Sequence, residues 1–111
     1  MPAPDLFGKK QVIVLGEFGG LGLPLEGHTW QQKDNWGYQS FKNADTLFAT
    51  YQTFMNSLEG LIQKGLSAAV YTQTTDVEVE TNGLMTYDRI MKLPEGDLKE
   101  LHDRLYLITT P

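Results

Sequence analysis

Two short apolar runs on either side of a helical stretch constrain the fold of this chain more than any other feature. Residues 11–15 (QVIVL) end at Gly16, and residues 67–72 (SAAVYT) come after the helical stretch. Runs of this length and composition are typical of strands that are buried on both faces. Because strands that alternate with helices pair in parallel through right-handed crossovers, the sequence predicts an α/β fold.

The expected helix between the two runs covers residues 46–64. Its apolar side chains recur at three- and four-residue steps and form one face. Asp45 is the expected N-terminal cap, and Gly65 is the expected stop. A second helix is expected to begin at Pro94, because proline is favoured in the first turn of a helix.

The segment between the second run and Pro94 partly alternates polar and apolar residues (DVEVETNGLMTY). The pair Asn82-Gly83 within it is a strong signal for a two-residue turn between antiparallel strands. The sequence therefore predicts a hairpin whose turn lies at Asn82 and Gly83.

The composition excludes several classes of function. The 111 residues carry a net charge of −5, which argues against nucleic acid or an anionic membrane as a partner. No apolar run approaches the roughly 20 residues that span a bilayer, and residues 1–10 lack a secretion signal, so a soluble protein of unassigned location is expected. There is no cysteine, and neither His28 nor His102 lies in a metal-ligand pattern, so no metal or cofactor is expected.

Residues 16–43 show no sustained period and are predicted to form a long loop, a kind of segment that is usually functional. Glu17 is the first carboxylate after the first run, and glycines beside it leave room for a ligand. In βα-barrels, residues at the carboxyl ends of strands face the substrate. Glu17 is therefore the leading catalytic candidate, and the alternative is a surface glutamate in a turn.

Aromatic residues in the long loop are candidates for sugar binding, because the apolar faces of sugar rings stack on aromatic planes. Trp30 is the candidate of this kind, and packing of the loop is the equal alternative. Trp36, Tyr38 and Phe41 are expected to fold the loop onto itself.

Polar residues follow the second run, and such groups can orient the hydroxyls of a ligand. Gln73 and Asp76 are the candidates, together with Tyr71 inside the run. The alternative for Asp76, Glu78 and Glu80 is the solvent face of a hairpin, which is commoner for alternating charge.

Parallel pairing also predicts where these residues meet. We expect Glu17, Gln73 and Asp76 at one end of the sheet, because parallel strands end at the same edge. The segments at Gly65 and Leu93 are expected near the other end.

Two stretches resemble the last two strand–loop units of glycoside hydrolase family 2, which includes β-galactosidases. These are VIVLGEFGGLGLPLEGHTW and AAVYTQTTDVEVETNGLMTYDR, and the likeness covers residues 4–107. It implies a partial (βα)8 TIM barrel, with residues 1–111 as the C-terminal piece of the catalytic domain. It also implies that Glu17 is the nucleophile of a retaining enzyme, and it makes Trp30, Tyr71, Gln73 and Asp76 plausible substrate contacts.

The sequence departs from that family in one respect that bears on activity. The family's acid/base glutamate follows an asparagine, and the chain contains no Asn-Glu pair. Since retention requires two carboxyl groups, the isolated chain is expected to be inactive. Two alternatives are a non-catalytic, self-associating remnant with weak carbohydrate binding, and a stand-alone enzyme that uses Glu17 with Asp76 or Glu78.

Incomplete strand pairing predicts association. Two strands leave two open edges, and neither run carries a charge that protects an edge. The face toward a barrel interior, with Val12, Val14, Ala69 and Tyr71 as candidates, would also be bare. We therefore expect a homo-oligomer or association with the rest of a barrel.

Overall fold

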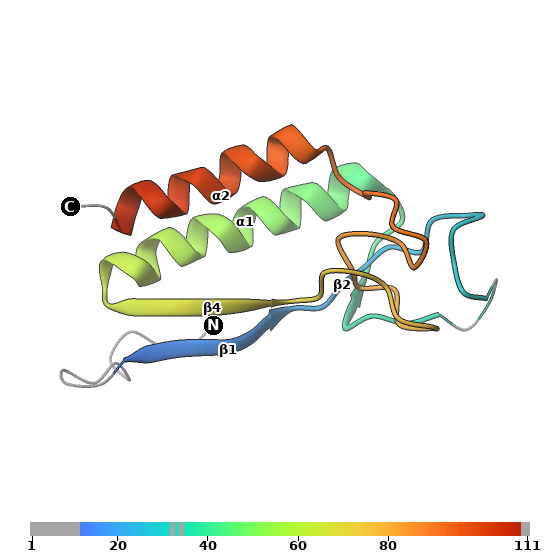
Figure 1. Cartoon of the computed structure of the whole chain (residues 1–111), viewed down its shortest axis with the longest axis horizontal. Helices are drawn as coiled ribbons and strands as arrows, with labels where there is room; N and C mark the ends of the chain where they lie inside the picture. Colours follow the sequence, from blue (N-terminus) through green and yellow to red (C-terminus); the bar gives the residue numbers. More distant parts are fainter. Residues whose placement is uncertain (1–11, 32, 34, 110–111) are drawn as a thin grey trace.

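The computed structural model describes residues 12–31, 33 and 35–109, and these residues form a mixed arrangement of helices and strands (Figure 1). The expected lead-in segment 1–10 and Gln11 lie outside the described residues. In chain order, the elements are β1 (Ile13–Gly19), β2 (Leu21–Gly22), β3 (Gln39–Ser40), α1 (Ala44–Gln63), β4 (Leu66–Thr72) and α2 (Glu95–Thr109).

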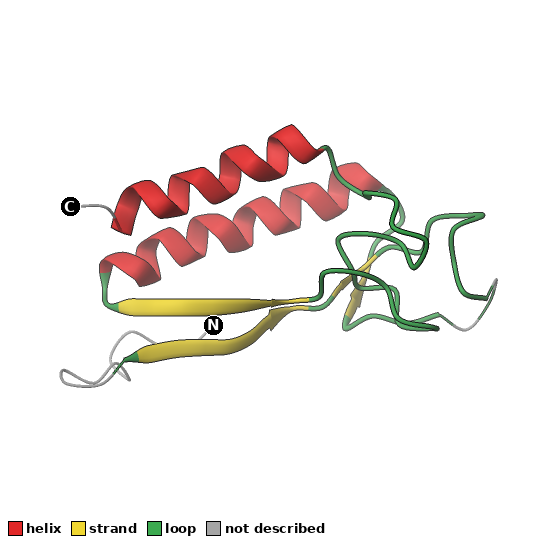
Figure 2. Ribbon diagram, viewed as in Figure 1, coloured by secondary structure: helices red, strands yellow, loops and turns green. Residues whose placement is uncertain are grey.

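β1 and β4 form a two-stranded parallel sheet, and α1 belongs to the connection between them (Figure 2). The predicted parallel pairing is confirmed. Phe18 pairs with Tyr71 and Gly19 with Thr72, so the carboxyl ends of both strands lie together. The short strands β2 and β3 also pair in parallel with each other, inside the segment that was expected to be one long loop.

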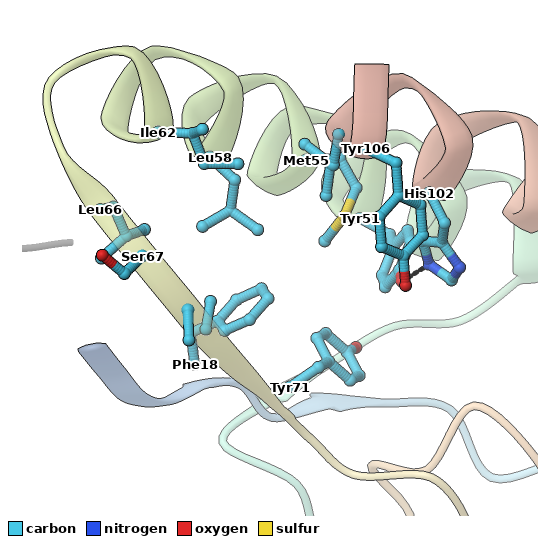
Figure 3. Close-up of a pocket in the computed structure, with 13 residues that line it drawn as sticks. Phe18, Tyr51, Met55, Leu58, Ile62, Leu66, Ser67, Tyr71, His102 and Tyr106 are labelled. Carbon is cyan, nitrogen blue, oxygen red and sulfur yellow. Dashed lines mark hydrogen bonds between the residues drawn. The ribbon is translucent and has the colours of Figure 1, made fainter. Parts of the chain in front are cut away.

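The two faces of the β1–β4 sheet have different environments. Ile13, Leu15 and Tyr71 pack against the hydrophobic core on the helix side, and Tyr71 is seen there in Figure 3. Val14 and Val70 are about half exposed, at 52% and 53%. The expectation that both strands are buried on both faces is wrong, because no described segment covers the second face.

The register corrects the set of residues on this uncovered face. Leu15 pairs with Ala69, so Ala69 and Tyr71 belong to the helix side, and their expected place on the bare face is wrong. Val70 takes that place. Val14 is exposed there as expected, and Val12, just before β1, is also exposed.

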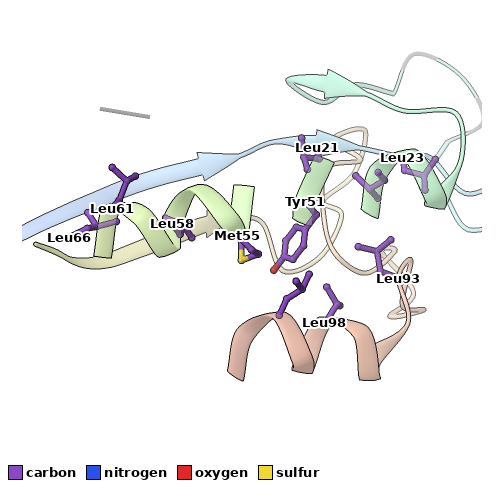
Figure 4. Close-up of a cluster of buried hydrophobic side chains, with 11 residues drawn as sticks. Leu21, Leu23, Tyr51, Met55, Leu58, Leu61, Leu66, Leu93 and Leu98 are labelled. Atoms are coloured by element: carbon purple, nitrogen blue, oxygen red, sulfur yellow. The ribbon is translucent and has the colours of Figure 1, made fainter. Parts of the chain in front are cut away.

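The hydrophobic core lies between the helices, the helix side of the sheet and the start of the first loop (Figure 4). Its members come from four elements or the segments beside them, namely β2, α1, β4 and α2, and not from the helices alone. The buried residues are Leu21, Leu23, Leu47, Tyr51, Met55, Leu58, Leu61, Leu66, Leu93, Leu98 and Leu101.

α1 begins two residues earlier than expected, because Asn43 caps it and Asp45 does not. The Asn43 side chain accepts a hydrogen bond from the Thr46 backbone N–H at 2.9 Å. Asp45 lies in the first turn, where a negative charge is favourable beside the helix dipole. The predicted apolar face is confirmed by its buried residues, which lie three or four positions apart: Leu47, Tyr51, Met55, Leu58 and Leu61.

α2 follows Pro94 directly and packs on α1. Between the helices, the Tyr51 hydroxyl forms a hydrogen bond with His102 Nε2 at 2.5 Å, and Arg104 pairs with Glu59 at 2.9 Å. No helix within the described residues has the length and apolar character to cross a membrane.

Leu93 lies close to Leu21 and Leu23 at the loop end of the molecule, as the labelled side chains show (Figure 4). Its expected position at the opposite end is wrong, because α2 begins near the carboxyl ends of the strands and runs back along α1 (Figure 1). Gly65 lies directly before β4, at the opposite end, as expected.

The hairpin after β4 turns earlier than expected. Val77 and Glu80 exchange two backbone hydrogen bonds of 3.0 and 2.9 Å, so the turn lies between them and not at Asn82-Gly83. Asn82 and Gly83 are buried. A Cβ atom at position 83 would lie 2.2 Å from the carbonyl carbon of Thr75, so glycine is required here for close packing of two backbone segments.

We predict that Gly83→Ala lowers the free energy of unfolding by about 1–3 kcal/mol, the usual range for overpacking. The clash is with backbone, which cannot move aside as a side chain does. The matched control is Gly60→Ala inside α1, where a Cβ meets nothing within 4 Å. That change should stabilise by about 0.5–1 kcal/mol. Urea unfolding measures both, and equal stability of the two variants would contradict the packing described here.

Candidate functional site

Glu17 lies inside β1, whereas the sequence placed it in a loop after a shorter strand. The register is irregular at this point, because Leu15 pairs with Ala69 and Phe18 pairs with Tyr71. Two residues of β1, Gly16 and Glu17, therefore stand opposite the single residue Val70. This is a β-bulge, a feature that redirects side chains and is common next to active sites.

The bulge decides which face carries the carboxylate. Side chains alternate along a strand, so a regular β1 would place Glu17 on the helix side with Ile13 and Leu15. The extra residue instead brings Phe18 to the helix side, where its ring contacts Phe54 and Tyr71. Glu17 is consequently exposed, beside Val70 and away from the helices.

A glycine pair shapes the surface next to Glu17. Gly19 and Gly20 have φ angles of 105° and 72°, which side-chain-bearing residues rarely adopt. A Cβ on Gly20 would lie 2.2 Å from the Tyr38 ring, so the glycine also makes room for that ring. Glu17, Phe18, Gly19, Gly20 and Tyr38 line an open hollow of about 270 Å³.

The hollow holds one carboxylate. Among the described residues that line it, Glu17 is the only acidic side chain. Within the described part of the chain, no group of three His, Asp or Glu side chains is placed to hold a metal ion. Chemistry that requires two carboxyl groups therefore needs a second group from outside this hollow.

Gln73 lies at the same end of the sheet as Glu17, but its amide is already engaged. Its Nε2 donates to Glu80 Oε2 at 2.8 Å and to Asn82 Oδ1 at 2.7 Å. Its backbone N–H donates to the Asn82 carbonyl at 3.2 Å. Gln73 therefore connects the end of β4 to the returning arm of the hairpin.

Asp76 is buried and ion-paired, in contrast to its expected role as a substrate contact. Its Oδ1 accepts from Lys92 Nζ at 2.7 Å and from the Gly83 N–H at 2.9 Å, and neither side chain of the ion pair is more than 1% exposed. Lys92 Nζ also donates to the Thr81 carbonyl. Burial lowers the pKa of Lys92, and its hydrogen bond to Asp76 opposes that shift. Asp76 thus connects the hairpin to the segment before α2, and its carboxylate is buried in this connection.

Trp30 is accessible and does not stand alone. It is 60% exposed, and its ring contacts the Tyr87 ring edge-on at 6.1 Å. Beside this pair, His28 Nδ1 lies 2.8 Å from Asp88 Oδ2. A hydrogen bond from the Thr86 hydroxyl, and then one from His28, lower the pKa of the Asp88 carboxyl. These contacts connect the first long loop to the segment before α2.

Tyr71 lies under the helices and not on the face that carries Glu17. Its ring packs edge-on against Phe18 and Tyr51, with centroid separations of 5.2 and 5.1 Å. Burial, and then the nearby Tyr51, raise the pKa of Tyr71 above its usual value. Of the predicted contacts, only Trp30 is both accessible and not committed to a polar network.

The residues that partner these side chains could not be predicted from the sequence. Lys92 and Asp88 lie in a segment that was noted for its turn signal, and nothing local marks them as partners of Asp76 and His28. One local signal could have predicted the bulge at Gly16 and Glu17. The glycine directly follows the apolar run, and a glycine within a strand often marks a bulge.

We predict that Lys92→Met costs about 3–5 kcal/mol of stability, because it leaves the Asp76 carboxylate buried without its cation. The double variant Lys92→Met/Asp76→Asn should recover part of this loss, since no buried charge remains. The control is Lys99→Met, which breaks the exposed Lys99–Asp103 pair on α2 and should change stability by less than about 1 kcal/mol. Equal effects in urea unfolding would mean that the Asp76 pair is not buried.

Comparisons with known proteins do not identify a family, so any assignment of function rests on the residues described above. No protein-family model and no curated protein matches the chain. The resemblance to glycoside hydrolase family 2 stays a prediction from the two quoted motifs.

Proposed function

We propose that the chain forms the last two strand–helix units of a (βα)8 barrel in a retaining β-glycosidase similar to glycoside hydrolase family 2. In this proposal, Glu17 is the nucleophile. The observation that carries it is the bulge at Gly16 and Glu17, which turns an exposed carboxylate away from the helices. In a βα-barrel the side of the strands away from the helices is the interior, and substrates bind at the carboxyl ends of the strands.

The arrangement of elements supports the barrel part of the proposal. A parallel strand pair with helices on one side is the repeating layer of such barrels. The uncovered side presents the apolar residues Val14 and Val70, which further strands would bury. The hollow beside Glu17 lies toward the shared carboxyl end of β1 and β4.

The two motifs that carry the family resemblance lie next to each other in the fold. GEFGG lies at the end of β1 and contains Glu17, the residue that the resemblance equates with the family nucleophile. YTQTTDVE begins at the end of β4, next to it in the sheet. Two motifs from separate parts of the sequence thus meet at one end of one sheet.

The proposed chemistry uses Glu17 in two steps. Its carboxylate attacks the anomeric carbon as the glycosidic C–O bond breaks, and the leaving oxygen takes a proton from a second carboxyl group. Water then attacks the anomeric carbon, gives a proton to that second group and releases Glu17. The two groups must lie about 5–5.5 Å apart, so in this proposal the rest of the barrel supplies the acid/base residue.

Two other functions deserve comparison with this one. A stand-alone enzyme would pair Glu17 with Asp76 or Glu78. Asp76 is disfavoured as the partner because it is buried against Lys92. Glu78 lies in the hairpin turn. A self-associating remnant with weak carbohydrate binding is favoured by the exposed Val14 and Val70 and by accessible Trp30.

We predict that the isolated chain does not hydrolyse 4-nitrophenyl β-glycosides above background, because it lacks the acid/base group. In a protein that contains the chain together with six further strand–helix units, Glu17→Gln should remove nearly all activity. Glu26→Gln, at an exposed glutamate in the following loop, should keep it. Turnover by the isolated chain that Glu17→Gln abolishes would instead establish the stand-alone enzyme.

We also predict that the isolated chain associates with itself. Among the described residues, neither β1 nor β4 has a second neighbouring strand, and the uncovered face is apolar at Val14 and Val70. Light scattering should give a mass above that of one chain, and Val14→Glu should reduce it because a charge then occupies the uncovered face. A wild-type monomer at every micromolar concentration would contradict the prediction.

A further inference from the structure

A second cavity lies on the helix side of the sheet, away from Glu17. It has a volume of about 260 Å³ and is bounded by α1, α2 and β4 (Figure 3). Phe18, Tyr51 and Tyr71 contribute aromatic rings to its wall, and Met55 and Leu58 contribute aliphatic surface. Nothing in the proposed glycosidase chemistry uses this space.

The cavity has a cause in the sequence of β4. Ser67, Ala68 and Ala69 follow each other and line the cavity. Between the large residues Leu66 and Tyr71, β4 offers only these small side chains, so no bulky side chain of β4 fills the space beneath the helices. The register places Ala69 on the helix side, so its methyl group is all that this position contributes to the packing.

Of the described residues that line this cavity, none carries a side chain with a permanent charge. It contains neither Lys, Arg, Asp nor Glu, and its ionisable groups are tyrosines and His102. Burial raises the pKa of Tyr51 to about 12, so its hydroxyl stays neutral at physiological pH. The described wall of the cavity therefore offers an ion no opposite charge to replace the hydration that it gives up.

The residues with polar side chains that line the cavity are Ser67, Tyr71, Tyr106 and the hydrogen-bonded pair of Tyr51 and His102. The Tyr51 hydroxyl lies 2.5 Å from His102 Nε2, and a phenol oxygen has one donor and two acceptor positions. When the hydroxyl donates to His102, its oxygen still accepts a hydrogen bond. The Tyr71 ring already contacts the rings of Phe18 and Tyr51 edge-on, an arrangement that a further aromatic ring can extend.

We propose that this cavity binds a small, uncharged aromatic molecule that carries one N–H or O–H donor, of the size and chemistry of indole. The volume exceeds the roughly 150 Å³ that holds benzene in an engineered apolar cavity, which leaves room for two fused rings. The donor hydrogen-bonds the Tyr51 oxygen, and the rings contact Tyr71, Phe18 and Met55. The site is independent of the proposed function, because it lies on the other side of the sheet from Glu17.

The test uses the whole chain, with indole and 1-methylindole as probes in isothermal titration calorimetry. Indole should bind saturably, and 1-methylindole, which lacks the donor, about fivefold more weakly. Ala69→Leu fills the cavity and should reduce indole affinity at least about tenfold. Val70→Leu, on the opposite face of the same strand, is the control and should leave affinity unchanged.

Methyl NMR locates the site without any substitution. Indole should shift the Met55 methyl resonance and leave that of Met85, which lines a separate surface groove, unchanged. Tyr51→Phe removes the accepting oxygen, so indole and 1-methylindole should bind this variant with similar affinity. Absence of saturable indole binding, a shift at Met85 instead of Met55, or full affinity in a folded Ala69→Leu variant would each overturn the proposal.

Discussion

The parallel pairing of β1 and β4 is the constraint on which the rest of the structure depends. Parallel neighbours cannot be joined by a tight turn, so the chain must cross from the end of one strand to the start of the next. α1 makes most of that return, and its apolar face covers one side of the sheet. α2 then packs on α1 and not on the opposite side. One face is therefore buried, and Val14 and Val70 stay exposed on the other.

Within that pairing, two irregularities compensate each other. β4 carries an extra residue, Ser67, opposite the step from Ile13 to Val14, and β1 carries one opposite Val70. The pairing of the two strands has the same offset at both ends. Between the two irregularities, the side of the sheet on which each side chain lies differs from that in a regular strand pair. Phe18 thereby joins the core, and Glu17 leaves it. The position of the candidate nucleophile thus follows from the single-residue insertion in β1 and not from the loop that was expected to carry it.

Much of the fold was predictable because its signals are local. The periodic apolar face of α1, the strand at residues 67–72 and the start of α2 after Pro94 all depend on residues close together in sequence. Parallel pairing then follows from the order of elements. Asn43 as the cap lay within two residues of the expected Asp45, which is the usual uncertainty at a helix end.

The site was harder to predict because its contacts join distant residues. Asp76 looks like an exposed acidic residue in an alternating segment, and only the fold brings Lys92 against it. The Asn82-Gly83 pair carries a strong turn signal, yet the turn forms at residues 78 and 79 because Gly83 is needed beside the Thr75 backbone. Local propensity was overridden here by close packing, as tertiary context often does.

The buried polar groups of this segment also explain how a surface made of loops can hold a defined shape. Lys92 ties together Asp76 and the Thr81 carbonyl, and Gln73 ties the end of β4 to Asn82. Each of these contacts lies among the segments that follow the carboxyl end of β4. Binding groups gain from support of this kind, because less conformational freedom remains to be lost when a ligand arrives. The apolar core sets the position of the strands, and the polar network sets the loops above them.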